Sequence, residues 1–160
     1  MTYWGFSGDE QVSAWLALSE ANDLSGAMKM IPGSHKTGKQ QHEITNDKDN
    51  VLLQGQTVRN VNEELSVLCS LKPGQASFHH GWTLHTSMPN KSDDRRIGLN
   101  IQYIATNIKQ LKNETDTAIC VRGYDEFNHF LKDEPAKVEI DFDALERFKE
   151  LDKQYKKTAS

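Results

Sequence analysis

Alternating apolar and polar positions predict two long strands in this chain. One runs from Gln11 to Leu18, where Val, Ala, Leu and Leu occupy every second position. The other runs from Arg96 to Ala105, where Ile, Leu, Ile and Tyr alternate with polar residues or glycine. A period of two residues is typical of a strand with one buried face. The second strand carries Arg96, Gly98, Asn100 and Gln102 on its other face, and we expect this polar face to line a wet pocket.

Shorter apolar runs predict four further strands, and turn residues separate them. These strands are expected at Ala27–Ile31, Glu64–Leu71, Ala76–His79 and Trp82–Ser87. The segment Lys72-Pro73-Gly74-Gln75 fits a type II turn, because proline sets the first central φ and glycine accepts a positive one. The residues from Ser34 to about Asn60 are polar, and a loop of this length is typical of a lid or a binding loop. Several short strands separated by turns favour a mostly β sandwich or barrel.

The C-terminal third predicts a loop followed by a helix. Residues Thr106 to Glu139 have weak periodicity. Between Asp141 and Tyr155 the apolar residues follow helical spacing, and Asp141 or Asp143 is suited to cap the helix. We therefore expect a core at residues 1–110 and an extension at residues 111–160, with a helix near residues 141–156.

The composition of the chain excludes some classes of binding partner. The chain has 160 residues, a net charge of −4 and 26% charged residues. This balance argues against nucleic acid and against an acidic membrane surface. No run of eighteen apolar residues is present, and the first residues do not resemble a secretory signal. We expect a cytoplasmic protein with no membrane or nucleic-acid partner.

Three histidines lie within seven positions, at His79, His80 and His85. The three histidines are possible ligands of a zinc ion, and a zinc site here would indicate a mononuclear zinc hydrolase. The spacing is a weak zinc signal, because cysteine or glutamate partners at the usual distances are missing. For His79 and His80 an ordinary hydrogen-bonded role in a strand is as good an interpretation.

A set of short segments occurs in a fixed order along the chain: Trp15-Leu16-Ala17-Leu18, Gly26, Ile31-Pro32-Gly33-Ser34-His35-Lys36, Leu71-Lys72-Pro73-Gly74-Gln75, His85-Thr86-Ser87-Met88-Pro89-Asn90 and Arg95-Arg96. This ordered set resembles the phytanoyl-CoA dioxygenase family of iron(II)- and 2-oxoglutarate-dependent oxygenases. The resemblance covers roughly Tyr3 to Ala105. The resemblance implies a double-stranded β-helix, which is a cupin-like jelly roll, and this agrees with the strands expected above.

The resemblance also implies a site for Fe(II) and for 2-oxoglutarate as cosubstrate, with a small organic molecule as substrate. In the family a 2-His-1-carboxylate triad holds the iron and leaves positions open for 2-oxoglutarate and dioxygen. By resemblance, His85 matches the distal histidine ligand, and Arg96 matches the arginine that binds the far carboxylate of 2-oxoglutarate. Ser87 matches a hydroxyl that helps to hold this carboxylate, and Trp15 matches a tryptophan that lines the cosubstrate pocket. Arg95 has the opposite strand parity and is the weaker candidate.

One part of the family pattern is missing. The triad also needs an H-x-D or H-x-E, and no histidine of this chain has an acidic residue at the second following position. In relatives this motif precedes a segment like Tyr3-Trp4. We therefore expect the C-terminal part of a dioxygenase, or an open reading frame that starts at an internal methionine, with a jelly roll incomplete at its N-terminus. We expect it to be inert alone and to self-associate through open sheet edges.

A second hypothesis stays open beside the dioxygenase. The chain would then be a non-catalytic cupin-like module that binds a small dicarboxylate through Arg96 without a metal. The zinc hydrolase is a third hypothesis, and it alone requires His79 as a ligand.

Overall fold

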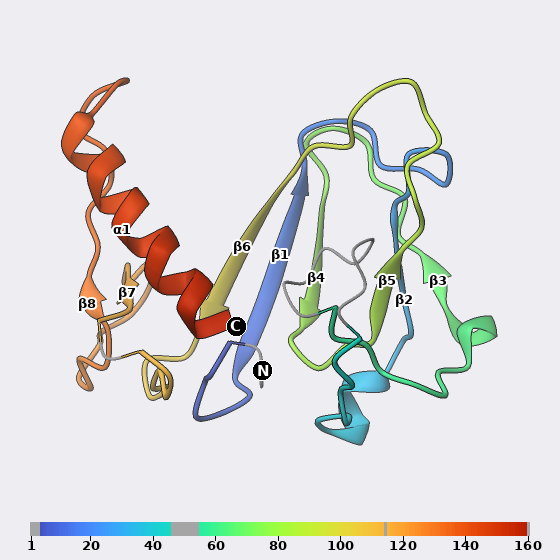
Figure 1. Ribbon diagram of the computed structural model, residues 1–160, viewed down its shortest axis with the longest axis horizontal. Helices are drawn as coiled ribbons and strands as arrows, with labels where there is room; N and C mark the ends of the chain where they lie inside the picture. Colours follow the sequence, from blue (N-terminus) through green and yellow to red (C-terminus); the bar gives the residue numbers. More distant parts are fainter. Residues whose placement is uncertain (1–3, 46–54, 114, 160) are drawn as a thin grey trace. The chain divides into compact units, whose positions relative to one another are not determined.

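The computed structural model describes residues 4–45, 55–113 and 115–159 and is mostly β, with one C-terminal α-helix (Figure 1). Its elements are β1 (Gln11–Ala17), β2 (Met28–Met30), η1 (Ser34–Thr37), η2 (Glu63–Leu65), β3 (Val67–Leu68), β4 (Ala76–His80), β5 (His85–Ser87), β6 (Gly98–Ile104), β7 (Thr117–Ala118), β8 (Leu131–Lys132) and α1 (Phe142–Ala159). They belong to two compact units. One comprises Met1–Asp9, Thr45–Gln56 and Ala105–Ser160, and the other comprises Glu10–Ile44 and Thr57–Ile104.

The unit that contains Glu10–Ile44 is built around β1. This strand pairs antiparallel with β4 on one side and with β6 on the other, which gives the order β4-β1-β6. In this register Ser13 lies opposite both His79 and Gln102, and Trp15 lies opposite both Ser77 and Asn100. Residues directly opposite each other share a face of the sheet, so these side chains form rows across three strands.

A second antiparallel sheet of the same unit has the order β3-β2-β5. The turn after β4 leads directly into β5 and joins the two sheets (Figure 1). The backbone N–H of Ile31 donates to the carbonyl of Leu84 at 2.9 Å, so the pairing of β2 with β5 extends to the residue before His85.

Burial along β1 differs from the predicted single buried face. Ala14 of the predicted buried face is buried, but so are Gln11, Ser13 and Ala17, which have the opposite parity. Val12, by contrast, is 40% exposed. The prediction of a half-buried strand assumed that polar residues face solvent, and here hydrogen bonds between strands let them be buried instead.

The unit that contains Ala105–Ser160 holds β7, β8 and α1. β7 and β8 form a short parallel pair. Ring contacts join Trp4 to Tyr155 of α1, with centroids 5.7 Å apart, and Phe6 to Phe130, with centroids 6.3 Å apart. The N-terminal residues and the C-terminal helix therefore pack within one unit.

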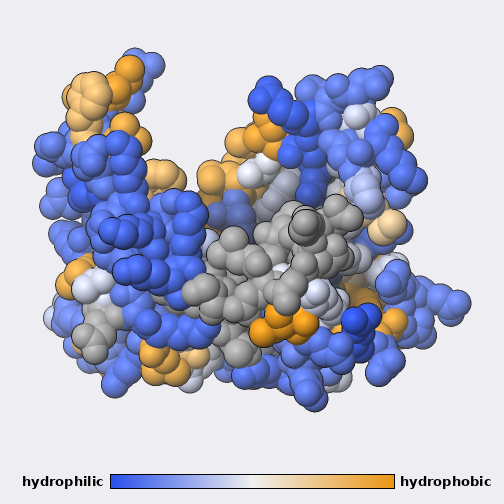
Figure 2. Space-filling model, in the orientation of Figure 1, coloured by the Kyte–Doolittle hydropathy of each residue, from blue (hydrophilic) through white to orange (hydrophobic). Residues whose placement is uncertain are grey.

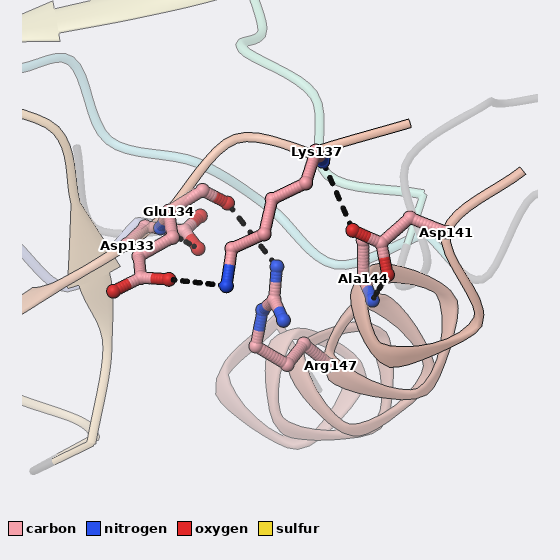
Figure 3. Close-up of polar contacts among 6 residues, drawn as sticks. All are labelled: Asp133, Glu134, Lys137, Asp141, Ala144 and Arg147. Atoms are coloured by element: carbon pink, nitrogen blue, oxygen red, sulfur yellow. Dashed lines mark hydrogen bonds and ion pairs between the residues drawn. The ribbon is translucent and has the colours of Figure 1, made fainter. Parts of the chain in front are cut away.

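Asp141 caps α1 at its N-terminus (Figure 3). One carboxylate oxygen accepts from the backbone N–H of Ala144 at 3.0 Å, and the other accepts from that of Lys137 at 2.9 Å. These two hydrogen bonds hold the pKa of Asp141 below its usual value. The arrangement satisfies one of the free N–H groups of the first helical turn, as expected for an N-cap residue.

Within each unit, hydrophilic residues make up most of the viewed surface, and hydrophobic residues lie among them (Figure 2). No helix in the described ranges is long and apolar enough to cross a membrane. Across the described residues, Cys69 and Cys120 are free thiols.

The long strands and the helix predicted from the sequence are confirmed, while several short elements differ in length. The run from Glu64 to Leu71 forms only part of η2 and the two-residue β3, and the run from Trp82 to Ser87 forms a strand only from His85. Part of the expected loop from Ser34 to Asn60 forms η1, and its residues 46–54 lie outside the described residues.

Candidate functional site

Arg96, Ser87 and Trp15 come from three different segments and meet at one place. The guanidinium carbon of Arg96 lies 5.4 Å from the centroid of the Trp15 ring, within the range of a cation–π contact. Its Nη1 donates a long hydrogen bond of 3.4 Å to the Ser87 hydroxyl. The structure thus brings together the three residues predicted to bind the cosubstrate. No hydrogen bond or ring contact joins the Arg95 side chain to Ser87 or Trp15, all of which are described residues.

Ser19 fixes the backbone around Arg96. Its hydroxyl accepts from the N–H of Ile97 at 2.7 Å and donates to the carbonyl of Arg95 at 3.2 Å. The N–H groups of Leu18 and Ser19 both donate to the carbonyl of Ile97. The end of β1 therefore holds the residues on both sides of Arg96, which fixes where its long side chain starts.

Gly98 provides the space for the Trp15 ring. A Cβ atom at Gly98 would lie 2.0 Å from Cζ2 and 2.3 Å from Cε2 of Trp15. Real Cβ atoms do not approach other heavy atoms so closely, so any side chain at this position would displace the indole. The absence of a side chain at Gly98 therefore keeps Trp15 beneath Arg96.

His85 begins β5, and its backbone is held by the turn after β2. The Ser34 hydroxyl donates to the carbonyl of Ile31 at 2.7 Å and accepts from the N–H of Leu84 at 2.9 Å. The His85 side chain is exposed, and its Nδ1 lies 2.8 Å from the carbonyl of Thr83. A carbonyl acceptor at Nδ1 favours the tautomer with a free lone pair on Nε2, which is the usual arrangement of a histidine that binds a metal.

His79 is the neighbour of His85 from the other sheet. The centroids of the two rings are 5.1 Å apart. Burial of His79, together with the neighbouring His85, lowers the pKa of His79 to about 4. Its Nδ1 is buried and has no hydrogen-bond partner among the described residues. An uncharged imidazole beside His85 avoids repulsion between two cations.

His80 belongs to a different group, and this separates the three histidines of the zinc hypothesis. Its ring lies 5.5 Å from that of His35 and 5.5 Å from that of Trp82, measured between centroids. Successive side chains of a strand point to opposite faces, which explains why His79 and His80 have different neighbours. Within residues 4–45, 55–113 and 115–159, no group of three His, Cys, Asp or Glu side chains is placed to hold a metal ion. The three-histidine zinc site is therefore not formed.

A network of polar side chains covers the face of the β4-β1-β6 sheet that also carries Trp15. Oε1 of Gln102 accepts from Oγ of Ser13 at 2.8 Å and also from Nε2 of Gln11. Gln11 and Ser13 are only 2% and 5% exposed. The polar face predicted for β6 is thus present, with Gln102 bonded to two residues of β1.

Sequence reasoning did not assign a role to Ser13, Gln11, Gly98 or Ser34. Gln11 and Ser13 alternate with Trp15 along the same strand and therefore lie on the same face of it. This spacing is the feature of the sequence that could have related them to the residues of the candidate cosubstrate site. Ser34 lies in one of the segments that carry the family resemblance, but its link to Leu84 joins residues fifty positions apart and has no local signal. Gly98 is one glycine among ten, and only the position of Trp15 distinguishes it.

Comparison with known proteins gives one family. The sequence model described as Phytanoyl-CoA dioxygenase (PhyH) matches residues 1–98. The 1-deoxypentalenic acid 11-beta-hydroxylase of Streptomyces arenae is 30% identical over 89 residues, which are 51% of this chain and 30% of that protein. The probable alpha-ketoglutarate-dependent hypophosphite dioxygenase of Stutzerimonas stutzeri is 32% identical over 111 residues, 65% of this chain and 38% of that protein. The chain thus matches less than two fifths of the length of these two relatives.

Solved structures agree with the sequence comparison. The apo form of the non-heme monooxygenase ThoJ aligns with a TM-score of 0.82 and 27% identity, over 99% of this chain and 57% of that one. EvdO2 from Micromonospora carbonacea var. aurantiaca, complexed with 2-oxoglutarate, aligns with a TM-score of 0.55 and 28% identity, over 64% of this chain and 41% of that one.

Proposed function

Because this chain belongs to the phytanoyl-CoA dioxygenase family, we propose that it serves an iron(II)- and 2-oxoglutarate-dependent dioxygenase that hydroxylates a small organic substrate. Within that enzyme the chain would supply the binding group for 2-oxoglutarate and one metal ligand. The observation that carries the proposal is the convergence of Arg96 with Ser87 and Trp15.

The described residues fit 2-oxoglutarate. A guanidinium offers a planar fork of N–H donors that matches the two oxygens of a carboxylate. The Ser87 hydroxyl lies beside this fork, and the Trp15 ring covers one side of it. A dicarboxylate can bind Arg96 with one end while its other end points along β5 toward His85, two residues from Ser87 on the same face of the strand.

The described residues do not fit a complete iron site. His85 is suited to be a ligand through Nε2, but the described ranges bring no second and third ligand together with it. We therefore assign this chain one ligand of the metal. We expect the purified chain to convert no 2-oxoglutarate to succinate above the rate without protein.

The same observation supports a second function. A non-catalytic module that binds a small dicarboxylate needs Arg96 and Ser87 but no metal. The two functions predict different coding DNA directly upstream of the Met1 codon. An in-frame H-x-D just ahead of Tyr3 would support the dioxygenase, while a stop codon there would favour the binding module.

Replacement of Arg96 tests the cosubstrate site directly. Lysine keeps the charge but loses the fork, so we expect Arg96→Lys to weaken binding of 2-oxoglutarate by about 10- to 100-fold. Isothermal titration calorimetry of the chain in EDTA measures this without any contribution of metal. Arg95→Lys is the matched control and should stay within about twofold of the parent. Equal losses in both variants, or no binding by the parent chain, would refute the proposed site.

A further inference from the structure

The face of the β4-β1-β6 sheet that carries Trp15 is polar but uncharged. Strand parity and the pairing register place the following residues on it: Gln11, Ser13, Trp15, Ala17, Ser77, His79, Gly98, Asn100, Gln102 and Ile104. None of them is Asp, Glu, Lys or Arg. The hydrogen bonds of Gln102 to Ser13 and Gln11, and the contact of Gly98 with Trp15, confirm that these side chains share one face.

Two side-chain amides on this face offer free donors. Oε1 of Gln102 is used twice, by Ser13 and Gln11, whereas its Nε2 has no partner among the described residues. The Asn100 side chain is exposed and makes no hydrogen bond to any described residue. In the register, Asn100 and Gln102 lie two positions apart on β6, so their amides are neighbours on the same face.

Polar atoms also lie beneath this face. Oε1 of Gln11, Oγ of Ser77 and Nδ1 of His79 are buried without a partner among the described residues. These atoms are already out of reach of a ligand, so the donors that a ligand meets are the side-chain amides of Asn100 and Gln102. An apolar chain laid over these amides leaves their donors unsatisfied, whereas a ligand with several hydroxyl or amide groups provides acceptors for them.

The position of this face relates it to the proposed reaction. Arg96 lies at one end of the rows, before Gly98, and Trp15 lies opposite Asn100. The next row contains Ser13, Gln102 and His79, and the His79 ring contacts that of His85. The row of Ser13, Gln102 and His79 is therefore beside the candidate metal ligand, and the rows that contain Gly98 and Asn100 lie between it and Arg96.

We propose that this polar face, with Asn100 and Gln102 as its donors, binds the substrate, and that the substrate is a neutral molecule rich in hydroxyl or amide groups. That the bound molecule is a substrate rests on the proposed dioxygenase function. A sugar or another polyol fits this surface. A fatty acyl chain does not, because it cannot satisfy the amides, and an anion finds no cation there other than the Arg96 assigned to 2-oxoglutarate.

Titration followed by NMR tests the inference with defined probes. The side-chain NH₂ resonances of the ¹⁵N-labelled chain are recorded during additions of methyl glucopyranoside and, separately, of sodium octanoate. We expect saturable shifts of the Asn100 and Gln102 amides with the glucoside only. Asn100→Ala, at an exposed position without hydrogen bonds, should weaken glucoside binding about tenfold, as should Gln102→Leu. Tyr103→Phe, on the opposite face of β6, should leave the affinity unchanged.

The outcomes separate this inference from the proposed function. Tighter binding of octanoate, no binding of the glucoside, or unchanged affinity in both Asn100→Ala and Gln102→Leu would overturn the inference. Binding of 2-oxoglutarate is measured in the same samples. If 2-oxoglutarate fails to bind while the glucoside shifts the two amides, the proposed function fails and the polar binding face stands. The reverse result leaves the proposed function intact and refutes the substrate class.

Discussion

Gly98 and Trp15 form a pair in which the smallest residue makes room for the largest. The indole lies where a side chain at Gly98 would be, and Arg96 lies over the indole. Close-packed contacts of this kind transmit a change at one residue to the next, because the neighbours have no free space into which to relax. The position of the Arg96 guanidinium thus depends on Gly98 through the Trp15 ring.

Gly98→Ala tests this dependence. The new methyl group must displace the Trp15 ring, so we expect the free energy of unfolding to fall by about 1–3 kcal/mol and 2-oxoglutarate affinity to fall with it. Urea denaturation and calorimetry measure the two effects. The double variant Gly98→Ala with Trp15→Phe removes the part of the indole that clashes and should recover stability. If the single variant is as stable as the parent, the close contact does not constrain the ring.

At the scale of residues, the sequence predicts the residues of the candidate cosubstrate site better than the residues that hold them in place. Trp15, Ser87 and Arg96 were found because they occur in an ordered set of motifs, and the structure brings them together. Their roles stay predictions. The sequence does not decide whether His79 is a metal ligand or an ordinary strand residue, because the contact with His85 joins two sheets and depends on the turn at Gly81.

At the scale of elements, Ser34 links the turn after β2 to the start of β5. Its buried hydroxyl bonds to Ile31 and Leu84, and Leu84 directly precedes His85. The turn therefore does more than reverse the chain, because it fixes the backbone from which the candidate metal ligand projects.

Ser34→Ala should remove this link. The N–H of Leu84 then loses its partner, and we expect the free energy of unfolding to fall by about 1–3 kcal/mol. Amide hydrogen exchange should show faster exchange at Leu84, since its N–H is no longer held. Ser66→Ala is a control of the same chemistry, because the Ser66 hydroxyl bonds only within its own exposed turn and its loss should cost much less. Equal destabilisation by the two variants would contradict the assigned link.

Asp141 has the corresponding role at the start of α1. The carboxylate form accepts the two backbone hydrogen bonds, and they hold its pKa below the usual value of 3.8 (Figure 3). Its stabilisation is therefore complete above the pKa of the unfolded chain and is lost as the pH falls through the lower pKa of the folded state. We expect helical circular dichroism to decrease below about pH 4.

Asp141→Ala should show a lower helix content already at neutral pH and a weaker decrease on acidification. Asp143→Ala is the control, because Asp143 is also in the first turn but does not supply the capping carboxylate. The assignment of the cap would be wrong if both variants gave the same pH profile.

The elements that the sequence predicted best are those with long regular patterns. β1, β6 and α1 repeat their pattern over several residues, and each was located to within a few positions. β3, β7 and β8 have two residues each, and two residues cannot display a period. Their pairing depends on partners distant in sequence, such as Leu131 for Thr117.

At the scale of the whole molecule, the described strands leave sheet edges open. β4 and β6 are the outer strands of one sheet in the described part of the chain, and β3 and β5 are those of the other. Unpaired edges present N–H and C=O groups that can pair with another chain. The predicted self-association through such edges stays a prediction, and so do the jelly-roll topology and the boundary at residue 110.

Phe78→Lys should reduce self-association if it occurs through β4. Phe78 is 70% exposed on this outer strand, so a charge there should disfavour pairing without cost to the fold. Sedimentation velocity over a range of concentrations measures the effect. Leu24→Lys is the control, because Leu24 is similarly exposed but lies in a turn. A parent chain that is monomeric at all concentrations would refute the prediction.

The stacking of Arg96 on Trp15 gives the protein a built-in optical reporter. Indole emission responds to nearby charge, and here the cation over the ring is the group proposed to bind a carboxylate. When a dicarboxylate neutralises Arg96, the field on the ring changes, so ligand occupancy becomes visible as a change in tryptophan fluorescence. The other two tryptophans, Trp4 and Trp82, can be replaced by phenylalanine so that the signal comes from Trp15 alone. Ligand screens can then be run on the unlabelled protein, without turnover and without metal.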